Sequence, residues 1–187
     1  MDADEKDHLN PDAWVDAAYV AFEKGGVGAV RVDRLAKELG ITRGSFYWHF
    51  KNRNALLRAV VEKWAALDTD ATIAANDAEG GTPPERLMRL LKTCASDDGA
   101  LEIGMRAWAR EDDAAMQRLL QIDDRRISYL AQLCSESGIP ETDARLRARV
   151  GYLAWLGFYT GTVTTPVEQR LADVECLWYM LLAPPAS

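Results

Sequence analysis

The sequence is poor in the residue types that carry most protein chemistry. It has three cysteines (Cys94, Cys134 and Cys176) and two histidines (His8 and His49) among 187 residues. The cysteines are widely spaced, form no CxxC pair and cannot all pair within one chain. We therefore expect reduced thiols and a cytoplasmic protein. Because no set of histidines and cysteines has the spacing of metal ligands, the sequence predicts no metal site and no cofactor.

Long apolar runs and catalytic motifs are missing as well. No stretch approaches the roughly eighteen consecutive apolar residues of a membrane span, and the first ten residues are acidic and polar, unlike a secretory signal. The chain has no phosphate-binding glycine motif and no serine, cysteine or carboxylate cluster suited to nucleophilic catalysis. We expect a protein that is not an enzyme and has no membrane partner.

A positive net charge is also missing, because the chain carries −7 overall. The charge is unevenly distributed, however. Residues 31–63 contain eight basic and three acidic residues, whereas residues 1–30 contain two basic and seven acidic ones, and residues 64–187 have a further acidic excess. A basic segment in an acidic chain is typical of a surface that binds a polyanion, with phosphate repelled elsewhere.

The hydrophobic pattern predicts an all-α protein. Apolar residues recur at three- and four-residue spacing almost throughout, and no segment alternates with period two. Asn10-Pro11-Asp12 is a typical helix start, and Gly25-Gly26 is expected to end that helix. We expect helices at about 32–39, 43–49 (capped by Thr42), from 53 onward, 84–96, 100–110, 114–137, 142–164 and 167–182, with a break at 76–84. The predicted plan is a three-helix head over 1–52 and a helical body over 53–187, which begins with a long fourth helix.

The segment from Val32 to Phe50 has the pattern of a helix-turn-helix. Its apolar positions would form the small core of two crossed helices, with Gly40 making the sharp turn between them. The second helix would then present its outer face to the major groove of DNA. We expect Arg43 to read guanine and Gly44 to permit close backbone approach. The full set of expected DNA contacts is Arg31, Thr42, Arg43, Gly44, Ser45, Tyr47, Trp48, His49, Lys51 and Arg53.

Residues 40–53, Gly-Ile-Thr-Arg-Gly-Ser-Phe-Tyr-Trp-His-Phe-Lys-Asn-Arg, followed by Ala55-Leu56-Leu57, resemble the DNA-binding signature of the tetracycline-repressor (TetR) family. The resemblance covers about residues 10–66, and the all-helical remainder is compatible with the family. One departure is Arg31, where the family often has a threonine or serine that caps the second helix.

The resemblance implies a homodimer that binds a near-palindromic operator in double-stranded DNA, with one head on each half-site. It also implies that a small-molecule effector in the C-terminal body releases the DNA, so we expect a ligand-responsive transcriptional repressor. An alternative keeps the DNA-binding head but makes the body a docking platform for another protein, without an inducer.

Two sets of body residues are expected to carry these roles. The effector is expected to contact Leu101, Glu102, Met105, Arg106, Trp108, Met116, Tyr129, Trp155 and Phe158, with Glu102 and Arg106 as polar anchors or as a surface pair. The expected dimer interface comprises Ala148, Gly151, Tyr152, Trp155, Tyr159, Val174, Leu177, Trp178 and Leu181. Either set can instead form intramolecular core, because periodicity does not say whose helix lies opposite.

Overall fold

The computed structural model describes residues 10–160 and 165–184, and its regular structure there is entirely helical, as the sequence predicts. None of the helices described combines the length and apolar character needed to cross a membrane. The chain divides into two compact units: unit 1 comprises Met1–Asp68 and Ala100–Leu119, and unit 2 comprises Thr69–Gly99 and Leu120–Ser187. The functional division after residue 52 stays a prediction.

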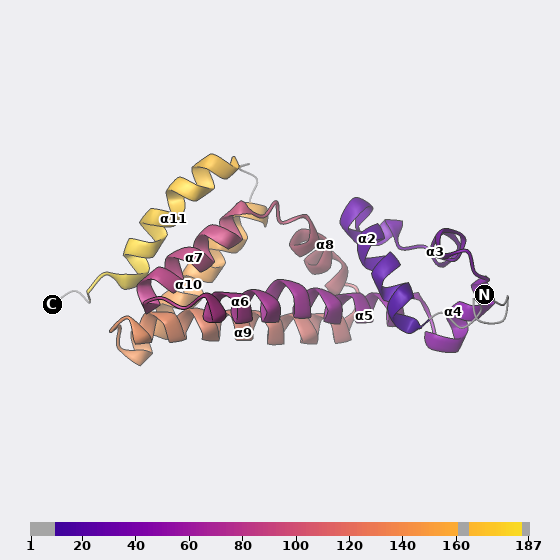
Figure 1. The fold of residues 1–187 in the computed structure, drawn as a ribbon, viewed down its shortest axis with the longest axis horizontal. Coiled ribbons are helices and arrows are strands. Elements are labelled where there is room, and N and C mark those ends of the chain that lie inside the picture. Colours follow the sequence, from indigo (N-terminus) through magenta and orange to yellow (C-terminus); the bar gives the residue numbers. More distant parts are fainter. Residues whose placement is uncertain (1–9, 161–164, 185–187) are drawn as a thin grey trace. The chain divides into compact units, whose positions relative to one another are not determined.

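Unit 1 begins with the three helices of the predicted head (Figure 1). They are α2 (Pro11–Ala29), α3 (Val32–Leu39) and α4 (Arg43–His49). The start of α2 is set by Asn10, whose side chain accepts a hydrogen bond from the Asp12 backbone at 3.2 Å. Gly25 and Gly26 leave the helical conformation, with Gly26 at a φ of 63°, so the predicted stop is a kink, after which α2 continues to Ala29.

The core of unit 1 contains a cluster of aromatic rings. The rings of Trp14 and Phe46 meet edge to face at 5.2 Å between centroids, and Phe46 stacks on Phe50 at 5.5 Å.

Unit 1 also contains α5 (Arg53–Trp64), α8 (Ala100–Ala109) and the start of α9 (Asp113–Glu136). Phe22 of α2 lies so close to Gly104 of α8 that a Cβ there would be 2.7 Å from the ring. The missing side chain therefore lets these two helices pack closely.

The predicted fourth helix appears as α5, the π-helical segment η1 (Ala65–Ala71) and α6 (Thr72–Glu79) in immediate succession. The expectation that the chain breaks at Asn76 is wrong for residues 76–79. Asn76 is buried, and its side-chain amide donates to the Tyr129 hydroxyl at 2.9 Å and to the Arg86 carbonyl at 3.2 Å. These tertiary contacts favour helix where the composition alone predicts a loop. The break is confined to Gly80–Thr82.

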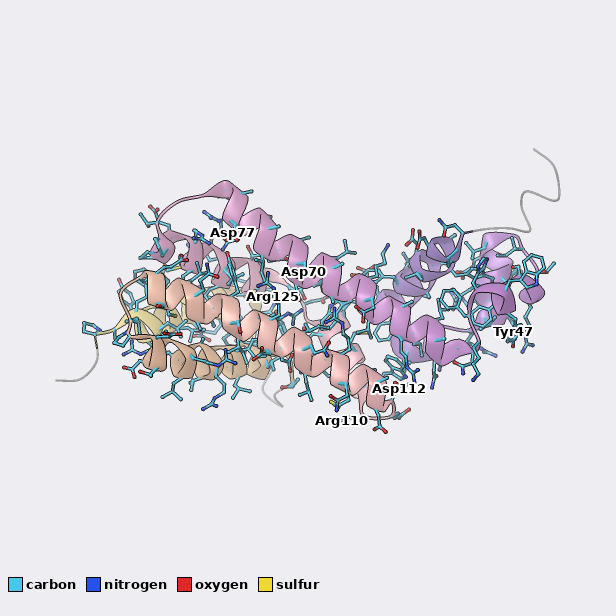
Figure 2. The ribbon with its side chains drawn as sticks, turned by 90° about the horizontal axis from the view of Figure 1, so that it is seen from below. Tyr47, Asp70, Asp77, Arg110, Asp112 and Arg125 are labelled. Carbon is cyan, nitrogen blue, oxygen red and sulfur yellow. The ribbon has the colours of Figure 1, made fainter. Side chains whose placement is uncertain are left out.

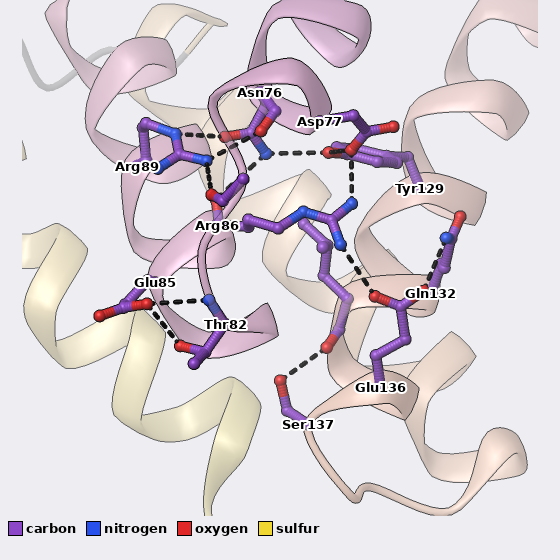
Figure 3. Close-up of polar contacts among 12 residues, drawn as sticks. Asn76, Asp77, Thr82, Glu85, Arg86, Arg89, Tyr129, Gln132, Glu136 and Ser137 are labelled. Atoms are coloured by element: carbon purple, nitrogen blue, oxygen red, sulfur yellow. Dashed lines mark hydrogen bonds and ion pairs between the residues drawn. The ribbon is translucent and has the colours of Figure 1, made fainter.

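Unit 2 also contains α7 (Pro83–Ser96), the rest of α9, α10 (Glu141–Thr160) and α11 (Val167–Leu182). Its apolar core is bordered by a polar network at the end of α6 (Figure 3). The Tyr129 hydroxyl donates to the Asp77 carboxylate at 2.5 Å, and Arg86 bridges Asp77 and Glu136. The hydrogen bond from Tyr129 has the largest effect on Asp77 and lowers its pKa, and the contacts with Arg86 act in the same direction. The network fixes α6 and α7 against α9.

Candidate DNA-binding site

A glycine turn and a threonine cap position the second helix of the predicted helix-turn-helix. Gly40 ends α3 in the left-handed conformation, with φ 70° and ψ 30°, which glycine adopts at little cost. Two residues later, Thr42 caps α4, because its hydroxyl oxygen accepts from the Ser45 backbone at 3.4 Å. Both helices have the bounds predicted from sequence. Arg31, where the family often has a capping threonine or serine, makes no side-chain cap on α3.

The inner face of α4 is fixed in the core of unit 1 by Phe46, which is fully buried. Ser45 lies on this face too. It is 1% exposed, and its hydroxyl donates to the Thr42 carbonyl at 2.9 Å. The prediction that Ser45 projects from the helix toward DNA is therefore wrong. Its hydroxyl closes the first turn of α4 instead, a local bond that serine makes readily at helix starts.

The outer face of α4 is exposed as predicted. Tyr47 and Trp48 keep 52% and 60% of their surface in solvent, and Figure 2 shows Tyr47 at the surface of the head. The other residues predicted to face solvent here are also exposed: Arg31, Thr42, Arg43, Gly44 and Lys51. Exposed aromatic rings beside cations offer apolar, polar and charged groups together to another molecule. The face therefore has the chemistry of a binding surface.

Arg43, at the start of α4, is held by two neighbours. One terminal nitrogen, Nη2, donates to the Tyr47 hydroxyl at 3.2 Å, and the other, Nη1, lies 3.3 Å from Oδ1 of Asp33. Both contacts raise the pKa of Arg43, and the hydrogen bond to Tyr47 has the larger effect. Sequence reasoning missed Asp33. The only signal was an acidic residue in the first turn of the preceding helix.

Gly44 is a glycine that the fold does not require. Its backbone φ is not positive, and a Cβ built there would meet only the Thr42 hydroxyl oxygen, at an ordinary 3.5 Å. No close contact among the residues described therefore requires glycine at this position. The missing side chain leaves the backbone of α4 bare on the exposed face, as expected if another molecule approaches it closely.

Two further predicted DNA contacts face the protein instead. Arg53 donates from Nε to the Val30 carbonyl at 2.6 Å and from Nη2 to the Val27 carbonyl. These bonds tie Arg53 to carbonyls at the C-terminal end of α2, of which that of Val27 also accepts from the Val30 backbone, and its contact with phosphate stays a prediction. His49 is half-buried, and its Nε2 atom is sealed from solvent without a hydrogen-bond partner among the residues described. The expectation that it projects freely is wrong.

Comparison with known proteins decides what this head is. The family model described as "Bacterial regulatory proteins, tetR family" matches residues 15–60, which span α2 to α5. The HTH-type transcriptional regulator SrpR of Pseudomonas putida is 24% identical over 91% of this chain and 84% of its own length. The head of this chain, over residues 15–60, belongs to the tetR family. The chain is accordingly a DNA-binding transcriptional regulator.

Other known proteins match the head or the whole fold. The class D tetracycline repressor of Escherichia coli is 34% identical over 67 residues, which cover 36% of this chain and 31% of the repressor. A putative TetR-family regulator from Mesorhizobium loti superposes with a TM-score of 0.73 at 16% identity, over 98% of each chain. FadR of Bacillus subtilis, solved with stearoyl-CoA, gives 0.61 at 15% identity, over 93% of this chain and 98% of FadR.

The predicted effector residues fall in both units. Leu101, Glu102, Met105, Arg106, Trp108 and Met116 belong to unit 1, and Tyr129, Trp155 and Phe158 belong to unit 2. Glu102 and Arg106 form an ion pair of 2.6 Å, in which the Glu102 side chain is 6% exposed, so they are not a surface pair. The Tyr129 hydroxyl is hydrogen-bonded to Asn76 and Asp77, and its place in an effector pocket stays a prediction.

A groove of about 580 Å³ lies between α7 and α11 within unit 2. None of the predicted effector residues lines it. Trp178, predicted for the dimer interface, forms part of its wall and donates from its indole nitrogen to the Pro84 carbonyl at 2.9 Å. The remaining lining residues are Glu85, Met88, Arg89, Lys92, Thr93 and Ser96.

The predicted dimer interface lies on the right helices but mostly on their inner faces. The buried members are Ala148, Gly151, Tyr152, Tyr159, Val174 and Leu181, and the half-buried ones are Trp155, Leu177 and Trp178. Leu181 packs so close to Gly151 that a Cβ there would lie 3.1 Å from its side chain. The small residues therefore serve close packing of α10 on α11 within one chain, and the prediction is wrong for the buried members.

The outer face of α10 was not anticipated. Leu146, Val150 and Leu153 are between 52% and 59% exposed, and Gly157 continues the same face. These four residues follow the spacing of one helix face, and we call them the α10 stripe. The sequence contains this second apolar periodicity, but nothing in it distinguishes the inner from the outer face.

Proposed function

We propose that this regulator inserts α4 into the major groove and reads base sequence there through Arg43. The observation that carries the proposal is the division of α4 into a core face fixed by Phe46 and an exposed face with a cation, a bare glycine backbone and two aromatic rings. A helix with its N-terminal residues exposed suits this groove, and arginine makes the commonest specific contact, with guanine.

The remaining exposed residues suit contacts with the DNA backbone. Arg31 and Lys51 flank the helix pair and carry positive charge, and Thr42 has a hydroxyl at the start of α4. Such contacts fix the register of the protein on the duplex without reading sequence. Trp48, the most exposed ring of α4, suits apolar contact with a thymine methyl or a sugar.

We assign the α10 stripe to self-association. Three large apolar side chains in a row on an exposed helix face indicate a protein contact, and Gly157 permits close approach. A two-fold homodimer places the same face of each chain in one interface and supplies two heads for a near-palindromic operator. A body that docks another protein would expose the same stripe. Sedimentation of the pure protein distinguishes the two possibilities, because only self-association gives a dimer without a second protein.

We further propose that a small molecule bound by the body releases the DNA, which makes the chain a repressor. Support comes from structural relatives: FadR was solved with stearoyl-CoA, and SmeT of Stenotrophomonas maltophilia is described as the repressor of a multidrug efflux pump. Release requires that the effector binds the DNA-free conformation more tightly than the DNA-bound one, since equal affinity shifts nothing.

Selection of duplexes from a randomised library, followed by fluorescence anisotropy, tests the DNA-binding proposal. Arg43→Ala should relax preference for the selected duplex over a shuffled duplex of equal composition. Lys51→Ala should weaken both duplexes alike and reduce the salt slope by about 0.9 for each phosphate that the protein no longer neutralises. Lys92→Ala, which removes one exposed lysine of α7, is the matched control and should change neither.

Two results would overturn the proposal. Failure of the wild type to enrich any sequence would remove sequence-specific DNA binding. Unchanged preference in Arg43→Ala would remove Arg43 as the base-reading residue.

A further inference from the structure

An acidic side chain lies among the exposed cations of the head. Asp33 occupies the first turn of α3, and its carboxylate faces the Arg43 guanidinium of α4 at 3.3 Å. Both side chains are largely in solvent, at 68% and 61% exposure. A carboxylate on a surface that meets phosphate is unfavourable for affinity, so its placement on Arg43 needs an explanation.

The stability of α3 explains only part of this placement. An acidic residue in the first turn interacts favourably with the helix dipole, and this matters here because Arg31 provides no cap. The dipole would be satisfied by a carboxylate pointing to water. Instead, Asp33 and the Tyr47 hydroxyl engage both terminal nitrogens of Arg43, and the guanidinium carbon lies 6.0 Å from the centre of the Tyr47 ring.

We propose that Asp33 is a specificity-determining residue, which restrains Arg43 from binding phosphate on any duplex that offers it no guanine. The inference rests on the proposed role of Arg43 in base reading. On non-cognate DNA a free arginine would add a phosphate contact regardless of sequence. Asp33 competes for the same cation, so it weakens this indiscriminate contact.

The magnitudes favour release of Arg43 at a cognate site and retention elsewhere. An exposed ion pair changes an equilibrium by about 1.4- to 5-fold. A bidentate arginine–guanine contact discriminates against the wrong base by about 5- to 150-fold. The guanine therefore outcompetes Asp33, whereas a single exposed phosphate contact is of similar strength to the pair and is largely cancelled by it.

Asp33→Asn tests the proposal, because it removes the charge and keeps the shape of the side chain. The matched control is Glu38→Gln, which removes one charge from the same helix and breaks the 2.9 Å pair between Arg34 and Glu38. The probes are the duplex selected by the wild type and a shuffled duplex of equal composition. Thermal unfolding of each variant reports separately on the helix-dipole contribution of Asp33.

We expect Asp33→Asn to tighten binding to the shuffled duplex by about 2- to 5-fold, with little change on the selected duplex. The salt slope on the shuffled duplex should steepen by up to about 0.9 for each head. Glu38→Gln should shift both duplexes equally and leave their ratio intact. In the Arg43→Ala background, Asp33→Asn should no longer alter the ratio, since its target is gone.

Equal affinity ratios in Asp33→Asn and Glu38→Gln would overturn the inference while leaving DNA binding by the wild type intact. A lower ratio caused only by weaker binding to the selected duplex would overturn it too, because Asp33 would then support the guanine contact. A wild type that selects no duplex would instead refute the proposed function itself.

Discussion

Replacement of Gly44 by alanine should stabilise the protein and weaken its binding to DNA. The two effects have opposite signs because they arise from different neighbours. Within the chain, the new methyl group meets only the Thr42 hydroxyl oxygen, at 3.5 Å, and the backbone of α4 is already helical. In the proposed complex, the same methyl group would point from the exposed face of α4 into the DNA groove.

The stability gain follows from the reduced freedom of the unfolded chain. A glycine-to-alanine change at a compatible backbone conformation contributes about 0.4–1 kcal/mol. For a chain of this length that raises Tm by about 1–4 °C. Overpacking by a methyl group at a close contact costs about 1–3 kcal/mol, which corresponds to about a 5- to 150-fold increase in Kd for the selected duplex.

Gly28 provides the matched control. It lies in α2 with a φ that is not positive, and a Cβ there would meet nothing within 4 Å. Gly28→Ala should therefore raise Tm by a similar amount and leave Kd unchanged. Calorimetry and fluorescence anisotropy on the same samples measure the two quantities.

A lower Tm for Gly44→Ala would refute the conclusion that its surroundings are open. A higher Tm combined with an unchanged Kd would refute close approach of DNA to this part of α4.

The remaining predictions concern the body and the acid range. Leu153→Glu should convert a sedimenting dimer to monomer without changing Tm by more than a few degrees, whereas Arg149→Gln, with the same change in charge, should stay dimeric. Asp112 is paired with Arg58 at 2.8 Å, which lowers its pKa, so its stabilising effect is present above its unfolded pKa of about 3.9 and is lost as pH falls further. Asp112→Asn should accordingly flatten the acid limb of unfolding free energy against pH; an unchanged limb would contradict the assignment. Asn52→Ala removes the cap that accepts from Ala55 at 2.9 Å and should cost about 1 kcal/mol in urea unfolding.

Local sequence signals specify the head almost completely. Short-range chemistry decides each feature there: Gly40 provides the left-handed turn, Thr42 caps α4, and Phe46 has the right spacing to enter the core. The bounds of α3 and α4 agree with the sequence prediction because these signals lie within a few residues of the helix ends they control.

Which polar residues are free depends instead on tertiary contacts. Arg53 lies at the start of α5, where its sequence position suggests a solvent-facing side chain, yet its guanidinium donates to carbonyls at the end of α2. The pairing of Asp33 with Arg43 likewise depends on how α3 and α4 cross. Spacing along the sequence does not identify such partners, because the fold determines which groups lie around each side chain.

The same distinction holds in the body. Periodicity placed α11 correctly and α10 as far as residue 160, while its predicted extension over 161–164 lies outside the described residues. Both faces of α10 carry apolar residues, and only packing shows that Ala148 is buried while Leu153 is exposed. Asn76 belongs to a helix for a similar reason, because its amide finds Tyr129 more than fifty positions along the chain. A sequence specifies where helices can form through local propensity, whereas the choice of buried face depends on distant partners that only the folded chain brings together.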